Sequence, residues 1–209
     1  MPKISEATRR EVRNKILVSA WKCFSREGFH ATSMDDVIAE TGMSSSSVYR
    51  YFRSKEELID VAAAETMAQT YSALAGLLDR EPVPGPTETI ATLLDSLRGK
   101  RGDEYDLTKI SMAAWAEALR RPDMHTLAHR FYAKMNAVFM ALTRRWISEG
   151  SLPEDTDIAA LPSLFVTLMP GMMVMSHLYE LPSAESLATG IVDFASATGR
   201  ASCTCEPTN

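Results

Sequence analysis

The chain has 209 residues, of which 45% are hydrophobic and 23% charged, ordinary proportions for a soluble globular protein. The sequence holds no run of about 18 apolar residues and no apolar signal core at its N-terminus. We therefore expect neither a membrane-spanning nor a secreted protein, but a cytoplasmic one. Three cysteines, Cys23, Cys203 and Cys205, are too few for a disulfide framework and fit a reducing compartment.

The net charge of −5 is divided unevenly along the chain. Residues 1–55 hold ten Lys and Arg against six Asp and Glu, so this part carries +4 and the remainder −9. A basic part on an acidic body is the asymmetry expected when one part of a protein meets phosphate and the other does not. The asymmetry supports nucleic-acid binding without requiring it, because many basic tails bind nothing.

A first helix is predicted over residues 9–27, from apolar side chains that recur at helical spacing. Gly28 follows as the residue that ends it, and Phe29 is then expected to pack against Phe24. Cys23 lies on the apolar face, so we expect a buried, inert thiol.

The stretch 32–55 predicts two short helices joined by a tight turn. Ser33 can cap the first helix, with Asp36 completing a capping box. Gly42 tolerates the left-handed conformation that the turn needs, and Ser44 is expected to cap the second helix. Two helices joined by a short turn that contains Gly form a helix-turn-helix, here over about residues 33–52.

The second helix of this pair, over residues 45–52, presents hydroxyl groups and one guanidinium but no carboxylate. Such groups donate to phosphate oxygens and base edges, whereas a carboxylate would be repelled. The alternative is a solvated helical hairpin in an all-α protein. Against it, Ser54 and Glu57 form another capping box, and Lys55 lies in a first helical turn, where a cation is unfavourable unless an anion such as phosphate is nearby.

The rest of the chain also has helical spacing, and no alternating strand pattern of useful length is present. We predict an all-α fold of about nine helices, in which a three-helix head is linked by a long helix to a second helical domain. After the head, helices are expected from Lys55 through Leu78, and over 87–97, 105–120, 122–149, 157–179 and 183–198, with the proline-rich stretch 81–86 ending the long one and a disordered tail over 200–209.

The first part of the sequence resembles the N-terminal DNA-binding domain of the TetR family of transcriptional regulators. The resemblance covers about residues 9–70 without a gap, and its motifs are specific. The chain departs from the family at Ser45 and Ser46, where Lys and Gly are usual, so base preference does not transfer. The resemblance is carried by Ile16, Leu17, Ala20, Phe24, Gly28, Phe29, Thr32, Ser33, Met34, Ile38, Ala39, Gly42, Met43, Ser44 and residues 48–58.

The resemblance implies phosphate contacts for Tyr51 and Lys55, and for Thr32 or Ser33 at the start of the second helix. The outward face of the third helix adds base-edge and phosphate donors. The predicted DNA-binding residues are therefore Thr32, Ser33, Ser44, Ser45, Ser47, Tyr49, Arg50, Tyr51 and Lys55.

The C-terminal half resembles the family more weakly, at residues 115–124 and 149–157. This resemblance implies an effector-binding and dimerisation domain over 71–199 that pairs through its last two long helices. The apolar faces predicted at the dimer interface hold Leu161, Leu164, Leu168, Met172, Met175, Leu187, Ile191 and Phe194.

An apolar cavity is expected between the long linking helix and the later helices. A methionine cluster, Met169, Met172, Met173 and Met175, is either core filling or an adaptable ligand wall, and Pro170–Gly171 suggests a bend there. A ligand wedged in this cavity would swing the long helix and move the DNA-binding heads apart. The predicted lining is Met67, Tyr71, Leu74, Leu94, Leu97, Met112, Trp115, Phe131, Met135, Phe165 and Met169.

Several patterns carry no chemistry. His125 and His129 are four residues apart but have no third ligand nearby, so we expect solvated side chains and no metal; Cys203 and Cys205 alone also fall short of a site. No nucleophile–base pair, phosphate loop or cofactor motif is present, which argues against an all-α enzyme. The sequence predicts a homodimeric repressor that binds a palindromic operator and is released by a small apolar or amphipathic effector. The alternative is an activator, or a regulator controlled by a protein partner.

Overall fold

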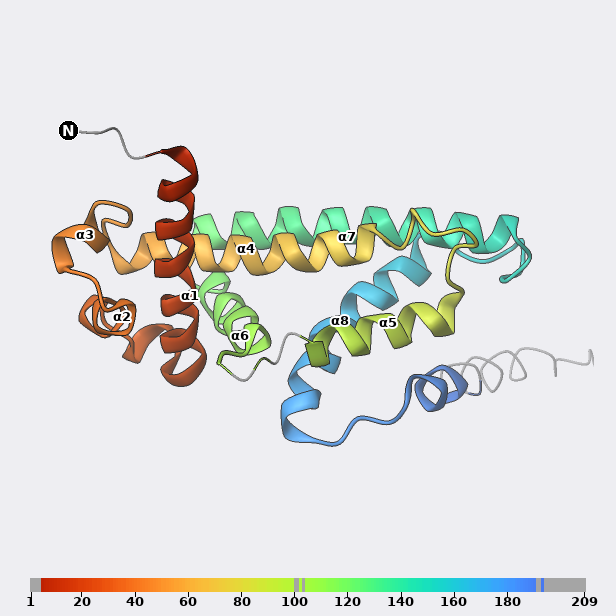
Figure 1. Ribbon diagram of the computed structural model, residues 1–209. Coiled ribbons are helices and arrows are strands. Elements are labelled where there is room, and N and C mark those ends of the chain that lie inside the picture. Colours follow the sequence, from red (N-terminus) through yellow and green to blue (C-terminus); the bar gives the residue numbers. More distant parts are fainter. Residues whose placement is uncertain (1–4, 100–101, 103, 191–192, 194–209) are drawn as a thin grey trace, which may run out of the picture. The chain divides into compact units, whose positions relative to one another are not determined.

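The computed structural model describes residues 5–99, 102, 104–190 and 193. Within these residues the chain is helical and has no strand, so the predicted all-α fold is confirmed (Figure 1). A further helical stretch begins at residue 184, where Ser183 Oγ accepts a hydrogen bond from Ser186 N at 3.2 Å. The elements before it are α1 Glu6–Ala31, α2 Met34–Thr41, α3 Ser45–Tyr49, α4 Lys55–Ala75, α5 Pro86–Gly99, α6 Leu107–Ala118, α7 Pro122–Ser148 and α8 Ala160–Leu178.

The helices form two compact units. The first holds the chain up to Leu74 together with Leu97–Ala137, and the second holds Ala75–Ser96 and the chain from Val138 onward. The long helix α4 therefore belongs to the first unit except for its last residue, whereas α7 contributes to both. The structure thus groups α6 and the first part of α7 with the head, and the functional division at residue 70 stays a prediction.

Helix α1 begins earlier than expected, because Ser5 caps it by accepting a hydrogen bond from Thr8 N at 3.1 Å. Gly28 interrupts it as predicted, with φ of 79°, and one further turn follows. The predicted contact of Phe29 with Phe24 is confirmed, with ring centroids 4.9 Å apart in an edge-to-face arrangement.

The core of the first unit is built from six helices that share one apolar cluster, to which α7 contributes Met124 and Ala128. Burial of each large side chain contributes about 1.5–3 kcal/mol. Cys23 is fully buried there, as predicted, and burial raises the pKa of its thiol. The cluster includes Ile16, Leu17, Ala20 and Phe24 of α1, Val37 of α2, Val48 of α3, Leu58 and Ala62 of α4, and Ile110 and Ala114 of α6.

The second unit is centred on aromatic side chains from α7 and α8. Trp146 is fully buried, and its indole N–H donates to the carbonyl of Pro84 at 2.7 Å. Phe165 of α8 stacks on Phe139 of α7, with ring centroids 4.9 Å apart and planes 11° from parallel. These contacts hold one face of α8 against α7.

Helix α8 continues through Pro170 and Gly171 as one helix, and the bend suggested there stays a prediction. By length and composition it is also apolar enough to cross a membrane, so the expectation that no such stretch exists is wrong. Only 22% of its apolar window is buried, because one side of α8 packs in the unit while Leu164, Leu168 and Met175 remain exposed. One such helix is weak evidence for a membrane span.

Candidate functional site

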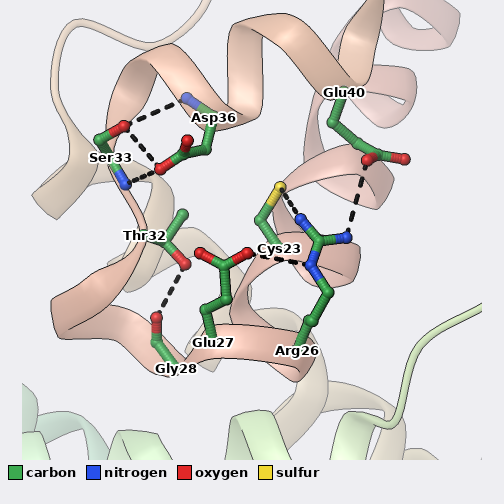
Figure 2. Close-up of polar contacts among 8 residues, drawn as sticks. All are labelled: Cys23, Arg26, Glu27, Gly28, Thr32, Ser33, Asp36 and Glu40. Atoms are coloured by element: carbon green, nitrogen blue, oxygen red, sulfur yellow. Dashed lines mark hydrogen bonds and ion pairs between the residues drawn. The ribbon is translucent and has the colours of Figure 1, made fainter.

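The start of α2 is fixed by a reciprocal capping box between Ser33 and Asp36 (Figure 2). Asp36 N donates to Ser33 Oγ at 3.2 Å, and Ser33 N donates to Asp36 Oδ2 at 2.8 Å. The Ser33 hydroxyl also donates to that carboxylate at 2.6 Å. These bonds hold the pKa of Asp36 below its ordinary value and confirm the predicted cap.

The turn after α2 takes the left-handed conformation predicted for Gly42, whose φ is 65°. Its N–H donates to the carbonyl of Ala39 at 3.2 Å. Thr41 closes the turn, since its hydroxyl donates to the carbonyl of Ile38 at 2.7 Å and accepts from the N–H of Met43 at 3.0 Å. The turn therefore fixes the direction in which α3 leaves α2.

Helix α3 is shorter than predicted, because the chain continues as a turn after Tyr49. Val48 is its buried anchor. Ser44 is the N-cap residue, as predicted, but its side chain makes no cap bond; its hydroxyl instead lies 2.8 Å from the hydroxyl of Ser47. A short helix held by one buried residue leaves most of its side chains at the surface.

The predicted DNA-binding side chains differ in exposure. Ser33, Ser44, Ser45, Tyr49 and Arg50 are exposed, and Ser47, Tyr51 and Lys55 are half-buried. Thr32 is fully buried, its hydroxyl donates to the Gly28 carbonyl at 2.8 Å, and its N–H points to the same oxygen at 3.4 Å (Figure 2). Both of its donors are occupied by this oxygen. The N–H and the hydroxyl of Ser33 are likewise occupied, by Asp36, so the predicted phosphate contact at Thr32 or Ser33 stays a prediction.

Lys55 has a protein partner that the sequence did not indicate. Its ammonium donates to the carbonyl of Thr32 at 3.0 Å and to that of His30 at 3.3 Å. These carbonyls lie at the end of α1, where the helix dipole is negative and a cation is favourable. The position of Lys55 in the first turn of α4 is therefore explained without an anion.

Two basic residues of α1 belong to ion pairs rather than to a DNA-binding face. Arg26 contacts Glu27 at 3.0 Å and Glu40 at 3.9 Å, as Figure 2 shows. Lys22 lies 3.1 Å from Glu104. Glu27 and Glu40 are already counted in the charge of +4, whereas Glu104 lies outside residues 1–55, so the Lys22–Glu104 pair lowers the charge that the head can offer to phosphate.

A groove of about 530 Å³ lies between α4 and α7 in the first unit. Three predicted ligand residues, Met67, Tyr71 and Phe131, line it. The full lining is Ala64, Met67, Ala68, Tyr71, Leu127, His129, Arg130, Phe131, Ala133 and Lys134. Arg130 and Lys134 were missed from the sequence, although their spacing of four residues beside Phe131 was a usable signal.

The other predicted ligand residues lie elsewhere. Leu74 and Met135 are fully packed, while Met112 and Trp115 of α6 are half-buried. Trp115 is hydrogen-bonded to Tyr132, and burial raises the pKa of Tyr132 to about 12. Leu94, Phe165 and Met169 belong to the second unit, and the side chain of Leu97 is outside the described residues.

The second unit has its own apolar cavity, of about 160 Å³, between α5 and α8. Phe165 lines it beside three residues predicted at the dimer interface, Leu161, Leu164 and Leu168. Of the other predicted interface residues, Met175 is exposed, Met172 and Leu187 are half-buried, and Ile191 and Phe194 lie outside the described residues.

The histidine pair on α7 has no third ligand beside it among the described residues. His125 and His129 are exposed, and the described part of the chain contains no group of three His, Cys, Asp or Glu that could hold a metal ion. Cys203 and Cys205 lie outside the described residues.

A polar cluster around the buried Glu117, at the end of α6, was also missed. Glu117 is 8% exposed, and its carboxylate lies 3.0 Å from His30 Nε2 and 2.9 Å from the guanidinium of Arg120. Next to it, Arg121 donates to Asp60 of α4 at 2.8 Å. These pairs join the α6–α7 junction to α1 and α4, and no local sequence pattern predicts them.

Comparison with known families identifies this arrangement. Residues 16–62 match the family described as bacterial regulatory proteins, tetR family. Residues 86–195, more than half of the chain, match the BetI-type transcriptional repressor C-terminal domain. The chain belongs to the TetR family of transcriptional regulators. Its helix-turn-helix is the DNA-binding motif of that family, so the resemblance inferred from the sequence is confirmed.

Individual relatives cover most of this TetR-family chain. The HTH-type transcriptional regulator UidR of Escherichia coli K12 is 24% identical over 179 residues, which span 86% of the chain and 88% of UidR. A Saccharomonospora viridis transcriptional regulator in complex with choline aligns with a TM-score of 0.72 at 20% identity, over 88% of this chain and 95% of that one. The SmeT–triclosan complex aligns with a TM-score of 0.68 at 19% identity, over 88% and 91%.

Proposed function

We propose that this TetR-family regulator is a homodimeric repressor that binds a palindromic operator and is released by a small effector. The observation that carries the proposal is the exposed, carboxylate-free surface of α3, oriented by the capping box of Ser33 and the left-handed turn at Gly42. Hydroxyl and guanidinium donors on a short, rigidly placed helix suit the major groove. Such a protein acts where the operator DNA is, in the cytoplasm.

Within this proposal, Arg50 is the strongest single DNA contact. It is exposed just after α3 and bears the only full positive charge among residues 41–52. Tyr49, Ser45 and Ser47 would add polar contacts. Tyr51 and Lys55 would bind phosphates on either side, as the family resemblance implies, whereas a phosphate contact from Ser33 would have to replace one of its bonds to Asp36.

The test is fluorescence anisotropy with the DNA upstream of the protein's own gene. Arg50→Ala should weaken operator binding by about tenfold to a hundredfold. Arg144→Ala is the matched control, because it removes the same charge from an exposed position of α7 in the second unit. Equal affinities for wild type and Arg50→Ala, or an equal loss in the control, would refute the assignment of α3.

We infer dimerisation from the short length of α3, the helix proposed to contact the bases. One helix as short as α3 reads too few base pairs to select a genomic site, and a twofold dimer doubles that number. The exposed leucines of α8, Leu164 and Leu168, together with Met175, offer an apolar stripe for a second copy. A partner helix covering this stripe would also account for the membrane-like composition of α8.

The proposed release mechanism runs through α4. Its first turn is tied to the end of α1 by Lys55, and its second turn is tied to the α6–α7 junction by Asp60 and Arg121. An effector that enters the groove at Met67 and Tyr71 would shift α4 against α7 and move the two heads of the dimer apart. A preference of about 3 kcal/mol for the released state suffices for a hundredfold loss of DNA affinity.

A further inference from the structure

The groove between α4 and α7 is apolar inside and basic at its rim. Its lining includes His129, Arg130 and Lys134 but no carboxylate. The apolar part comes from Met67, Leu127, Phe131 and the ring of Tyr71, with alanines completing it. On a chain with a net charge of −5, ten lining residues without one acid are a notable local excess of positive charge.

The two strong cations of the rim lie on one face of α7. Arg130 and Lys134 are four residues apart, so their side chains are neighbours on the helix. Lys134 Nζ lies 5.7 Å from the ring centroid of Tyr71, across the groove on α4. Neither cation forms an ion pair with an acidic side chain in the described part of the chain, so both charges are available to a ligand.

The groove has the size and the polarity pattern of a small-molecule site. Ligand pockets usually hold about 300–1,000 Å³, are mostly apolar and contain a few convergent polar groups. Ala64 and Ala68, one turn apart on α4, leave room opposite α7 because neither side chain extends beyond Cβ. Charged donors beside such a floor favour a ligand with an apolar body and an anionic head.

We propose that this groove binds an amphipathic anion, with its carboxylate or phosphate head on Arg130 and Lys134 and its apolar body on Met67 and Phe131. The proposal rests on the proposed function, for which it names the class of effector. A quaternary ammonium such as the choline bound by the Saccharomonospora viridis regulator is disfavoured here. It would meet two cations and no carboxylate, and the Tyr71 ring already faces the ammonium of Lys134.

The test compares probes that share a chain and differ in the head group. Decanoate, decyl phosphate, decanol and decyltrimethylammonium are titrated below their micellar concentrations into the full-length protein by calorimetry. We expect both anions to bind more tightly than decanol, and the cation to bind most weakly. The ratio of the two anions tells a carboxylate effector from a phosphate effector. Equal or tighter binding of the cation would overturn the proposal.

Three variants locate the site. Arg130→Ala and Lys134→Ala should each weaken decanoate binding by about tenfold or more, as expected for a lost charge-assisted hydrogen bond, and leave decanol binding unchanged. Ala68→Trp should fill the groove and reduce binding of both. Arg144→Ala, also on α7, is the charge-matched control and should bind decanoate like wild type. Unchanged binding in the three groove variants, or an equal loss in the control, would refute the site.

The DNA assay separates this proposal from the one on which it rests. Wild-type protein that binds its operator but no anionic probe would contradict the effector class and leave the repressor intact. Wild-type protein that binds decanoate in the groove but no operator would contradict the repressor and leave the site intact.

Discussion

The helix-turn-helix and α8 are stabilised in different ways. In the helix-turn-helix, short-range bonds fix each change of direction: Ser33 with Asp36, Thr41 with Ile38, and the left-handed Gly42. In α8, distant aromatic contacts hold one face and the other face is left apolar and uncovered. The difference suggests that the helix-turn-helix is stabilised within one chain, whereas the exposed apolar face of α8 is covered by a second chain.

The largest expected effect tests whether the DNA-binding head is stabilised by its own core. Phe24 is 2% exposed and packs edge-on against Phe29. Phe24→Ala should lower the free energy of unfolding by about 3–5 kcal/mol, because it removes buried apolar surface and leaves a cavity. The measurement is urea unfolding followed by circular dichroism. Leu119→Ala, at a side chain that is 86% exposed, should change stability by less than about 0.5 kcal/mol. A loss below 1 kcal/mol for Phe24→Ala would mean that this core does not stabilise the head.

The next prediction tests whether a second chain covers α8. Leu168→Glu places a charge in the exposed apolar stripe and should weaken self-association by about a hundredfold, since burying an unpaired carboxylate is costly. Sedimentation at micromolar concentration should then give a monomer. Leu119→Glu introduces the same charge at an exposed leucine outside α8 and should stay dimeric. A monomeric wild type would contradict the proposed dimer.

A smaller effect is expected at Lys55, which has two roles within the account. Lys55→Ala should weaken binding to all DNA sequences alike and reduce the slope of log affinity against log salt by about one. It should also lower the melting temperature, because the carbonyls of His30 and Thr32 lose a donor. A lower melting temperature with an unchanged salt slope would show that Lys55 only joins α4 to α1.

The smallest effect concerns the cap of α2. Ser33→Ala should cost about 1 kcal/mol of stability at neutral pH, because Asp36 N loses its acceptor. Thr126→Ala, at an exposed hydroxyl on α7 whose bond is to the helix backbone, is the control and should cost less. Chemical unfolding of both variants measures the difference, and equal costs would contradict a special role for the cap.

The same substitution should change the dependence of stability on pH. The pKa of Asp36 is lowered in the folded state, chiefly by its hydrogen bonds with Ser33. Its contribution is therefore present above the ordinary Asp pKa of 3.8 and is lost as the pH falls through the lowered value. Unfolding curves between neutral pH and pH 3 should show a shallower acid loss for Ser33→Ala than for wild type. Parallel curves would contradict this linkage.

The sequence predicted what short-range chemistry decides. The Ser33 cap, the Gly42 turn and the contact of Phe29 with Phe24 each involve residues within a few positions, so their side-chain types alone specify the geometry. It also predicted the family and the all-α fold. The inward turn of the Thr32 hydroxyl to the Gly28 carbonyl is also a short-range contact, one helical turn back in the chain, but it was not predicted.

The features that the sequence did not predict depend on contacts between distant segments. The Lys55 ammonium lies beside carbonyls more than 20 positions earlier in the chain, and Arg121 meets Asp60 across 61 positions. Arg130 and Lys134 form the basic rim of a groove only because α7 lies beside α4. A single sequence gives no measure of which helices become neighbours.

The central claim is that α3 of a twofold dimer reads a specific operator. Its most direct test is a stoichiometric anisotropy titration of the DNA upstream of the gene against a scrambled duplex of equal length, at physiological salt. The account predicts two chains per palindromic site and an affinity about a thousandfold or more above that for the scrambled duplex. Equal affinity for the two duplexes would contradict it.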